Sequence, residues 1–129
     1  MARTLRPARP LADADSATCI LRVDPFDGST GVFRDAAVVL RLSQPLDDHS
    51  LGPDALRVCD TEGVVPGCVQ VTGEGAVLVW TGARPLRAHD LHFVLASGLR
   101  DTLGREIPSH CSRFVPGALA FADLRGTTG

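Results

Sequence analysis

The stretch 98–108, "GLRDTLGREIP", places an acid, a glycine and a proline directly after an apolar run that is typical of a strand. One interpretation of its acid, Asp101, is a calcium site between loops, with Asp24 and Asp27 as the other ligands. Calcium takes roughly six to eight oxygen ligands, and these carboxylates have no spacing like that of an EF-hand. The calcium site is therefore kept as the alternative, and no metal site is expected.

The second interpretation of the same stretch is a corner between two strands. An aspartate can accept hydrogen bonds from backbone N–H groups two residues further on, which closes a turn. Gly104 can supply the left-handed residue of such a turn, and Pro108 keeps the following segment extended. We expect Asp101 to shape this corner.

The histidines of "HDLH", His89 and His92, are candidate metal ligands because they lie close together in the sequence. Residues three apart on a strand point to opposite faces, so we expect a turn histidine and a half-buried one instead. Asp90 between them is accompanied by no Gly-x-Ser-x-Gly motif or other activated nucleophile. The "GEG" at 73–75 is followed by no helix, so it predicts a hairpin turn and not a phosphate loop. We expect no catalytic residue, no cofactor and no enzymatic activity.

The cysteines have spacings that match no zinc-binding pattern. They are Cys19, Cys59, Cys68 and Cys111. If 55–59 and 67–71 form a hairpin, Val58 faces Val69 inward while Cys59 and Cys68 face each other outward. This register predicts a cross-strand disulfide between Cys59 and Cys68, although it also suits two reduced thiols.

The elements that must position these residues are short apolar runs separated by Gly, Pro and Asp, a pattern typical of all-β proteins. The expected strands cover 18–23, 36–42, 55–59, 67–71, 76–80, 91–96 and 111–115. About seven strands are typical of a β-sandwich. One helical turn is expected within 46–56, capped by Asp47 or Asp48.

Composition limits the kind of protein. The chain has 129 residues, which suits one domain, and its formal net charge of −2 excludes strong electrostatic attraction to nucleic acid or to an anionic membrane. No segment has the length of a membrane-spanning helix, so no membrane insertion is expected. Lys, Asn and Tyr are absent. Since A/T-rich codons specify all three, we infer a high-GC genome, and a bacterial source is the expectation.

The predicted organisation is a sandwich domain at 18–116 between an extended N-terminal arm or linker at 1–17 and a C-terminal one at 117–129. The arms are expected from a start rich in Pro, Ala and Arg and from the final "GALAFADLRGTTG". The start has positive charge but no apolar region after it, so a Sec signal is not predicted. We therefore expect the chain to be cytoplasmic or to be carried as part of a larger surface or secreted particle.

Several stretches together resemble the SbsA-type Ig-like domain, a bacterial module first noted in S-layer proteins. They are "VDPFDGSTGV" at 23–32, "VVLRLSQPLDDHSL" at 38–51 and "VLVWTGARPLRAHDLHFVLASGLRDTLGREIP" at 77–108. Gln44, His92 and Arg105 stand where this family usually has Glu, an aromatic residue and Asn. The resemblance covers about 18–116 and implies an Ig-like β-sandwich with a structural or interaction role.

The outward positions of the predicted strands are unusually apolar. The candidate interface residues are Val39, Val77, Val79, Leu91, Phe93 and Leu95, with Leu119, Phe121 and Leu124 of the C-terminal arm as further anchors. A sheet that faces water normally alternates apolar with polar residues. Either the register slips by one residue, or an arm folds back over the sheet, or this face binds other protein subunits in a homo- or hetero-assembly.

The function expected from the sequence is a non-enzymatic structural or interaction module, namely a spacer, adhesion or assembly domain of a bacterial surface or particle. A first alternative is a small accessory or decoration subunit of a larger assembly, such as a phage-tail-like particle. A second alternative is a ligand-binding domain with a metal or glycan in its loops. Sugar-binding platforms use exposed aromatic side chains, whereas Trp80 falls on the expected core face.

Overall fold

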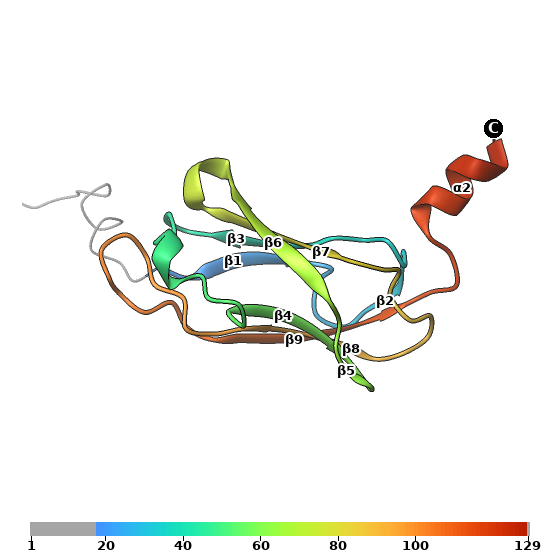
Figure 1. The fold of residues 1–129 in the computed structure, drawn as a ribbon, viewed down its shortest axis with the longest axis horizontal. Helices are drawn as coiled ribbons and strands as arrows, with labels where there is room; N and C mark the ends of the chain where they lie inside the picture. Colours follow the sequence, from blue (N-terminus) through green and yellow to red (C-terminus); the bar gives the residue numbers. More distant parts are fainter. Residues whose placement is uncertain (1–17, 129) are drawn as a thin grey trace, which may run out of the picture.

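The computed structural model describes residues 18–128, so the predicted arm at 1–17 lies outside the described residues. Two β-sheets pack face to face (Figure 1). In spatial order, the four-stranded sheet consists of β1 (Ile20–Asp24), β3 (Val38–Leu42), β7 (Val77–Gly82) and β6 (Gly67–Thr72). The five-stranded sheet consists of β2 (Ser29–Val32), β9 (His110–Pro116), β8 (His92–Ala96), β4 (Leu56–Asp60) and β5 (Gly63–Val64).

The predicted all-β sandwich is confirmed, and each of the expected strands forms close to its predicted range. Strands β2 and β5, which have four and two residues, were not expected from the sequence. Strand β2 ("STGV") is too short and too rich in small residues to show an alternating pattern. It runs parallel to β9, whereas the other strand pairs of the described chain are antiparallel.

The core lies between the two sheets and follows from the alternation of side chains along each strand. On β3, Val38 and Leu40 are fully buried while Arg41 between the inward positions is exposed. Trp80 of β7 is 2% exposed, as its expected place on the core face requires. Facing them from the five-stranded sheet are the buried side chains of Leu56, Val58, Val94, Ala96 and Phe114. Full burial of one such aliphatic side chain stabilises the fold by about 1.5–3 kcal/mol.

The predicted hairpin turn after β6 is also confirmed. Thr72 pairs with Val77, and the turn between them has left-handed backbone angles at Gly73 (φ 59°), Glu74 (φ 59°) and Gly75 (φ 92°). Glycine adopts this region without steric cost, whereas Glu74 does not. The turn therefore relies on two glycines that flank one strained residue.

The predicted pairing of Cys59 with Cys68 is wrong, because β4 and β6 lie in different sheets. Cys59 is opposite Val64 in the short β4–β5 hairpin, and Cys68 is opposite Thr81 of β7. Between these strands the chain passes from one sheet to the other at Val65 and Pro66, and proline has no N–H to continue a ladder. All four cysteines are free thiols.

Besides the 3-10 turn Gly73–Gly75 of the β6–β7 hairpin, two short helical segments lie outside the sheets of the described chain. The expected single turn is the 3-10 helix Asp48–Ser50, whose N-cap Asp47 accepts a hydrogen bond from the His49 N–H. At the other end, the described part of the predicted C-terminal arm at 117–129 is not extended, because helix α2 (Phe121–Thr128) forms there. Within residues 18–128 no helix is long and apolar enough to cross a membrane.

Candidate interaction surfaces

The outer face of the four-stranded sheet carries a small apolar cluster made of three of the predicted interface residues. Val39 of β3 is opposite Val79 of β7, and Val77 lies two residues from Val79 on the same side. All three are half-buried and alternate with the fully buried Leu40 and Leu78, so their outward placement is confirmed. Arg41 of β3 is opposite Val77, and the neighbouring strands add polar residues on both sides, namely Arg22 and Asp24 of β1 and Gln70 and Thr72 of β6.

The outer face of the five-stranded sheet carries a second apolar cluster. Phe93 of β8 is opposite Cys59 of β4, and Cys59 is in turn opposite Val64 of β5, which is 59% exposed. Leu95 of β8 is half-buried next to Cys111 of β9. The row Val64, Cys59 and Phe93 ends at Arg113 of β9, which is opposite Phe93, and Arg57 of β4 is opposite Leu95. The apolar cluster is therefore bordered by one arginine on each side.

These two clusters belong to opposite sides of the molecule, which corrects the expectation of one continuous apolar face. The sequence shows which residues point outward but not which sheet each strand joins, and this is why the expectation was wrong. Leu91 lies just before β8 and is 38% exposed. Each outer face is therefore partly apolar, and neither is covered by the described residues.

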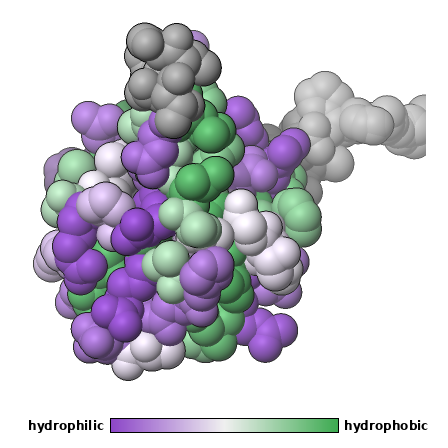
Figure 2. All heavy atoms as spheres, turned by 90° about the vertical axis from the view of Figure 1, so that its right-hand side faces the viewer, coloured by the Kyte–Doolittle hydropathy of each residue, from purple (hydrophilic) through white to green (hydrophobic). Residues whose placement is uncertain are grey.

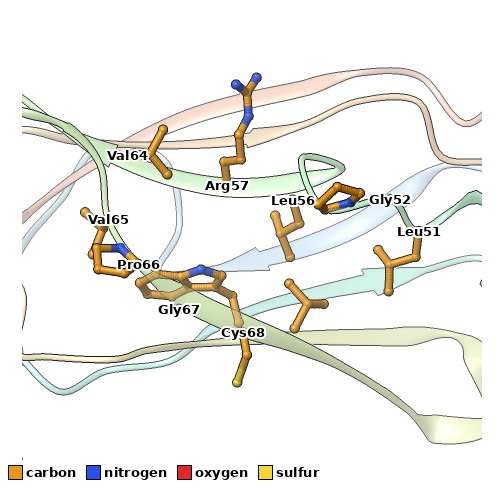
Figure 3. A pocket seen from close by; sticks show the side chains of 12 residues that line it. Leu51, Gly52, Leu56, Arg57, Val64, Val65, Pro66, Gly67 and Cys68 are labelled. Carbon is orange, nitrogen blue, oxygen red and sulfur yellow. The ribbon is translucent and has the colours of Figure 1, made fainter.

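A cleft of about 370 Å³ opens along the side of the sandwich where β6 and the β4–β5 hairpin diverge (Figure 3). Its walls are mostly apolar and include Leu51, Leu56, Val65, Val69 and Trp80. Gly67 of β6 has no room for a side chain, because a Cβ atom there would lie 2.6 Å from the Trp80 ring. In Figure 3 the guanidinium of Arg57 and the thiol of Cys68 point away from the cleft, so its interior offers no titratable group for chemistry.

The C-terminal segment brings its predicted anchors to the end of the sandwich opposite the 98–108 corner (Figure 1). Phe121 packs edge-on against Phe33 with ring centroids 5.7 Å apart, and both rings remain partly exposed. The carboxylate of Asp35 accepts hydrogen bonds from the backbone N–H groups of Phe121 (2.7 Å) and Ala122 (3.1 Å). These bonds, led by that from Phe121, outweigh the opposing effect of burial and lower the pKa of Asp35.

Apolar side chains stay accessible at this end of the molecule. Leu119 is 51% exposed and Leu124 is 39% exposed. Figure 2 looks at this end and shows a strip of hydrophobic surface between more polar flanks. Asp35 was not among the expected site residues, because no local pattern relates it to a helix that begins 86 residues later.

Asp101 shapes the corner, as predicted from its spacing to Gly104. Its carboxylate is 1% exposed and accepts bonds from the Leu103 N–H (3.0 Å), the Arg105 N–H (2.9 Å) and the Arg105 Nε (2.9 Å). The hydroxyl of Thr18 donates a further bond of 2.6 Å. Burial alone would raise the pKa of Asp101, but these donors outweigh it and lower the pKa to about 2.

The carboxylates proposed as calcium ligands do not converge. Asp101 binds Thr18, just before β1, whereas Asp24 is the last residue of β1 and pairs with Arg22. At about 3.3 Å per residue, these positions lie roughly 20 Å apart along the strand. Asp27 accepts a hydrogen bond from the Arg113 N–H. Among residues 18–128 no group of three or more His, Cys, Asp or Glu side chains is arranged to hold a metal ion.

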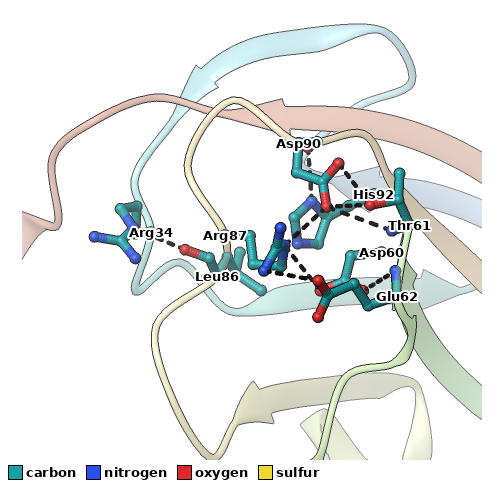
Figure 4. Close-up of polar contacts among 8 residues, drawn as sticks. All are labelled: Arg34, Asp60, Thr61, Glu62, Leu86, Arg87, Asp90 and His92. Carbon is teal, nitrogen blue, oxygen red and sulfur yellow. Dashed lines mark hydrogen bonds and ion pairs between the residues drawn. The ribbon is translucent and has the colours of Figure 1, made fainter.

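The loop before β8 holds a polar network around Arg87 (Figure 4). Asp90 accepts bonds from the Thr61 hydroxyl and from Arg87 Nε (3.1 Å), and Arg87 also pairs with Glu62 (3.4 Å). Burial opposes the ionised form of Asp90, but the bonds from Thr61 and Arg87 lower its pKa overall. Asp90 is therefore a weak base, and the network serves to attach the 83–91 loop to the β4–β5 turn.

The two histidines have separate roles. His89 is exposed in a turn with φ 61°, as expected. His92 is fully buried and not half-buried as predicted, and it stacks on Phe114 with ring centroids 5.2 Å apart. Its Nδ1 lies 2.9 Å from the Asp90 carbonyl oxygen. His92 thus fills an aromatic position of the core, and the two rings do not form a common site.

No protein-family model matches the chain, and no curated protein matches it. Solved structures show the likeness instead. The N-terminal part of the bacterial S-layer protein SbsC is 19% identical, with a TM-score of 0.65 over 85% of this chain and 26% of that one. A longer SbsC structure has a TM-score of 0.62 at the same identity, over 15% of its length. This chain thus spans about a quarter or less of the S-layer chains that it matches.

Other solved structures share the architecture. CopC from Methylosinus trichosporium OB3b is 12% identical, with a TM-score of 0.62 over 78% of this chain and 93% of that one. An L,D-transpeptidase from Mycobacterium smegmatis is 23% identical, with a TM-score of 0.56 over 80% of this chain and 41% of that one. At these identities the likeness shows the fold alone. The comparisons therefore support an S-layer-like Ig-type fold for this chain.

Proposed function

We propose that this chain is a non-enzymatic interaction module of the SbsA-type Ig-like class, acting as a spacer, adhesion or assembly domain of a bacterial surface or particle. The observation that carries this proposal is the apolar cluster on the outer face of the five-stranded sheet. Val64, Phe93 and Leu95 keep exposed apolar surface where a solvated sheet would carry polar side chains.

The polar groups of the described chain support a binding role over a catalytic one. Asp101 is ionised at neutral pH and its oxygens are occupied by donors from its own corner. Asp90 is held by Thr61 and Arg87, and its lowered pKa makes it unsuitable as a general base. These strong polar contacts fix loops, while the apolar side chains remain available to other protein subunits.

The test is a charge substitution on each outer face, with sedimentation and partner capture as readouts. Phe93→Asp alters the five-stranded face, and Val79→Asp alters the four-stranded face. We expect Phe93→Asp to abolish binding to partner subunits through the five-stranded face while the circular dichroism spectrum stays that of the wild type. Ser109→Asp, which adds the same charge at an exposed position just before β9 and outside both clusters, is the matched control. If both aspartate variants associate as the wild type does, the proposed function is refuted.

A second candidate is a small accessory or decoration subunit of a larger assembly, which the C-terminal end favours. Leu119, Phe121 and Leu124 present apolar surface on a segment that projects from the sandwich (Figure 1). Such a segment can insert into a groove of a neighbouring subunit. Deletion of 118–129 discriminates the two candidates, because it removes binding by the accessory subunit and leaves binding through the Phe93 cluster intact.

A further inference from the structure

Strand β6 forms one edge of the four-stranded sheet, and within residues 18–128 its only strand partner is β7. The N–H of Ala83 donates to the Pro66 carbonyl, and hydrogen-bonded pairs alternate along an antiparallel ladder. Cys68, Gln70 and Thr72 therefore bond to β7. The N–H and C=O groups of Gly67, Val69 and Val71 point away from the sheet.

The other three edges of the sandwich carry features that hinder the addition of a strand. Strand β1 contains Arg22 and Asp24 and has a register irregularity, and β2 also has one. Strand β5 has two residues. By contrast, β6 has six residues in unbroken register with β7 and contains no charged residue and no proline. Charges, bulges, prolines and short length are the usual protection of an edge strand, and β6 has none of them.

The cleft described above runs beside this edge. Val69 and Val71 point toward the core from β6, and Val69 and Trp80 line the cleft. Because side chains alternate, a strand added to β6 would also direct every second side chain toward this opening. Apolar side chains at those positions would cover Trp80 and the apolar wall behind it.

We propose that β6 pairs with β6 of a second copy of this chain, antiparallel and centred on Val69. This register places Val69 opposite its counterpart and Gly67 opposite Val71, so all outward groups of both strands are used in about six hydrogen bonds. The space beside Gly67 is filled by the Trp80 ring, on which the incoming valine then packs. No like charges face each other across the pair.

Charge complementarity at the ends of β6 favours a second copy over an unrelated strand. Glu74 lies in the turn after β6, and Arg84 follows β7 at the opposite end of the hairpin. Both are exposed, and neither has an ion pair within the described residues. In the antiparallel pair Glu74 of one copy lies about two strand spacings, on the order of 10 Å, from the backbone at Arg84 of the other. Their long side chains can span this gap.

This inference rests on the proposed function, since it names one partner of an assembling module. A ladder of this length buries little surface, so the expected dimer is weak and depends on protein concentration. The edge and the Phe93 cluster lie on different sheets, which allows each to be tested without altering the other.

The first experiment measures self-association by sedimentation equilibrium over a range of concentrations. Gln70→Lys places two ammonium groups diagonally across the pair, and we expect the dissociation constant of the dimer to rise at least tenfold. Thr81→Lys is the matched control, because it adds the same charge to the same outer face one strand further in and should change the constant less than threefold. A wild-type protein that stays monomeric at its highest soluble concentration overturns the proposal, and so do equal effects of the two variants.

The second experiment tests the register by cross-linking. In the proposed pair Gln70 is opposite Cys68 of the other copy, and such a non-hydrogen-bonded pair has a Cα separation that suits a disulfide. With Cys19, Cys59 and Cys111 replaced by serine, Gln70→Cys should give a covalent dimer when oxidised glutathione is added. Thr72→Cys in the same background should react far more slowly. Equal yields from the two variants would refute the register centred on Val69.

The third experiment exchanges the charges at the ends of the strand. Glu74→Arg and Arg84→Glu should each weaken the dimer, and the double variant should restore it. These residues lie at opposite ends of one hairpin, so restoration requires contact between copies. If Gln70→Lys leaves self-association intact while Phe93→Asp abolishes binding to partner subunits, the edge pairing is refuted and the proposed function stands. If Gln70→Lys weakens self-association and Phe93→Asp leaves binding to partner subunits intact, the edge pairing stands and the role of the Phe93 cluster is refuted.

Discussion

An aspartate carboxylate organises each end of the sandwich, and the two differ mainly in their exposure to water. At one end, Asp101 is 1% exposed and accepts bonds from Thr18, Leu103 and Arg105. At the other end, Asp35 is exposed and accepts two backbone bonds from the start of α2. Both carboxylates satisfy backbone N–H groups that would otherwise lack a partner.

The same kind of hydrogen bond to an aspartate has different consequences at a buried and at an exposed position. Because Asp101 is buried, water does not readily replace a lost donor or acceptor there, so the corner must be satisfied as a whole. Around Asp35 water competes for every group, so the helix can detach without disturbing the core. The end around Asp101 is therefore part of the cooperative fold. The end around Asp35 is a peripheral attachment that is suited to binding.

The largest effect is expected from Asp101→Asn. One acceptor oxygen is replaced by an NH2 group that faces the donors of Thr18 and Arg105, and Arg105 loses its counter-charge. We expect the free energy of unfolding to fall by about 2–4 kcal/mol. Urea denaturation followed by circular dichroism measures this loss.

Asp24→Asn is the matched control at an exposed carboxylate. Asp24 pairs with Arg22 at the surface, and such pairs contribute on the order of 0.5 kcal/mol or less. If the two asparagine variants unfold at the same urea concentration, burial does not distinguish the corner from a surface ion pair, and our comparison fails.

The next largest effect is expected in the pH dependence of the free energy of unfolding. The pKa of Asp101 is lowered from 3.8 to about 2 in the folded protein. A lowered folded-state pKa contributes stability that is complete above pH 3.8 and is lost as the pH falls toward 2. The expected loss is about 2 kcal/mol. It should appear when the urea midpoint of the wild type is compared with that of Asp101→Asn, whose curve should be flatter over this range of pH.

The fold was predictable because its information is local. The alternation around Val38, Leu40 and Leu78 predicts both the strands and their buried faces, and the structure confirms them. Sheet membership was not predictable in the same way. Whether Cys59 and Cys68 are partners depends on where the chain crosses between sheets, and the crossing at Pro66 resembles an ordinary loop in the sequence.

The polar groups show the same difference between contacts that are local in the sequence and contacts that depend on the fold. The spacing of Asp101 to Gly104 predicts the Asp101 corner, because the donors from Leu103 and Arg105 are its neighbours in the chain. The bond from Thr18 joins residues 83 positions apart, and no pattern in the sequence indicates it. Arg87 and Asp90 do have a signal, since their charges lie three residues apart, but their contacts with Thr61 and Glu62 depend on the fold.

The smallest effect on global stability is expected at Asp35. Asp35→Ala removes the acceptor for the Phe121 and Ala122 N–H groups and leaves the core untouched. The urea midpoint should stay that of the wild type, because Asp35 and the contact of Phe121 with Phe33 lie outside the buried core. Amide hydrogen exchange at Phe121 and Ala122 should accelerate at least tenfold, while exchange at Val38 and Val94 in the core stays unchanged. Asp48→Ala, on an exposed turn at the opposite end, is the control that should alter neither set. If Asp35→Ala also accelerates exchange at Val94, then the helix belongs to the cooperative fold and the two ends of the molecule are equivalent after all.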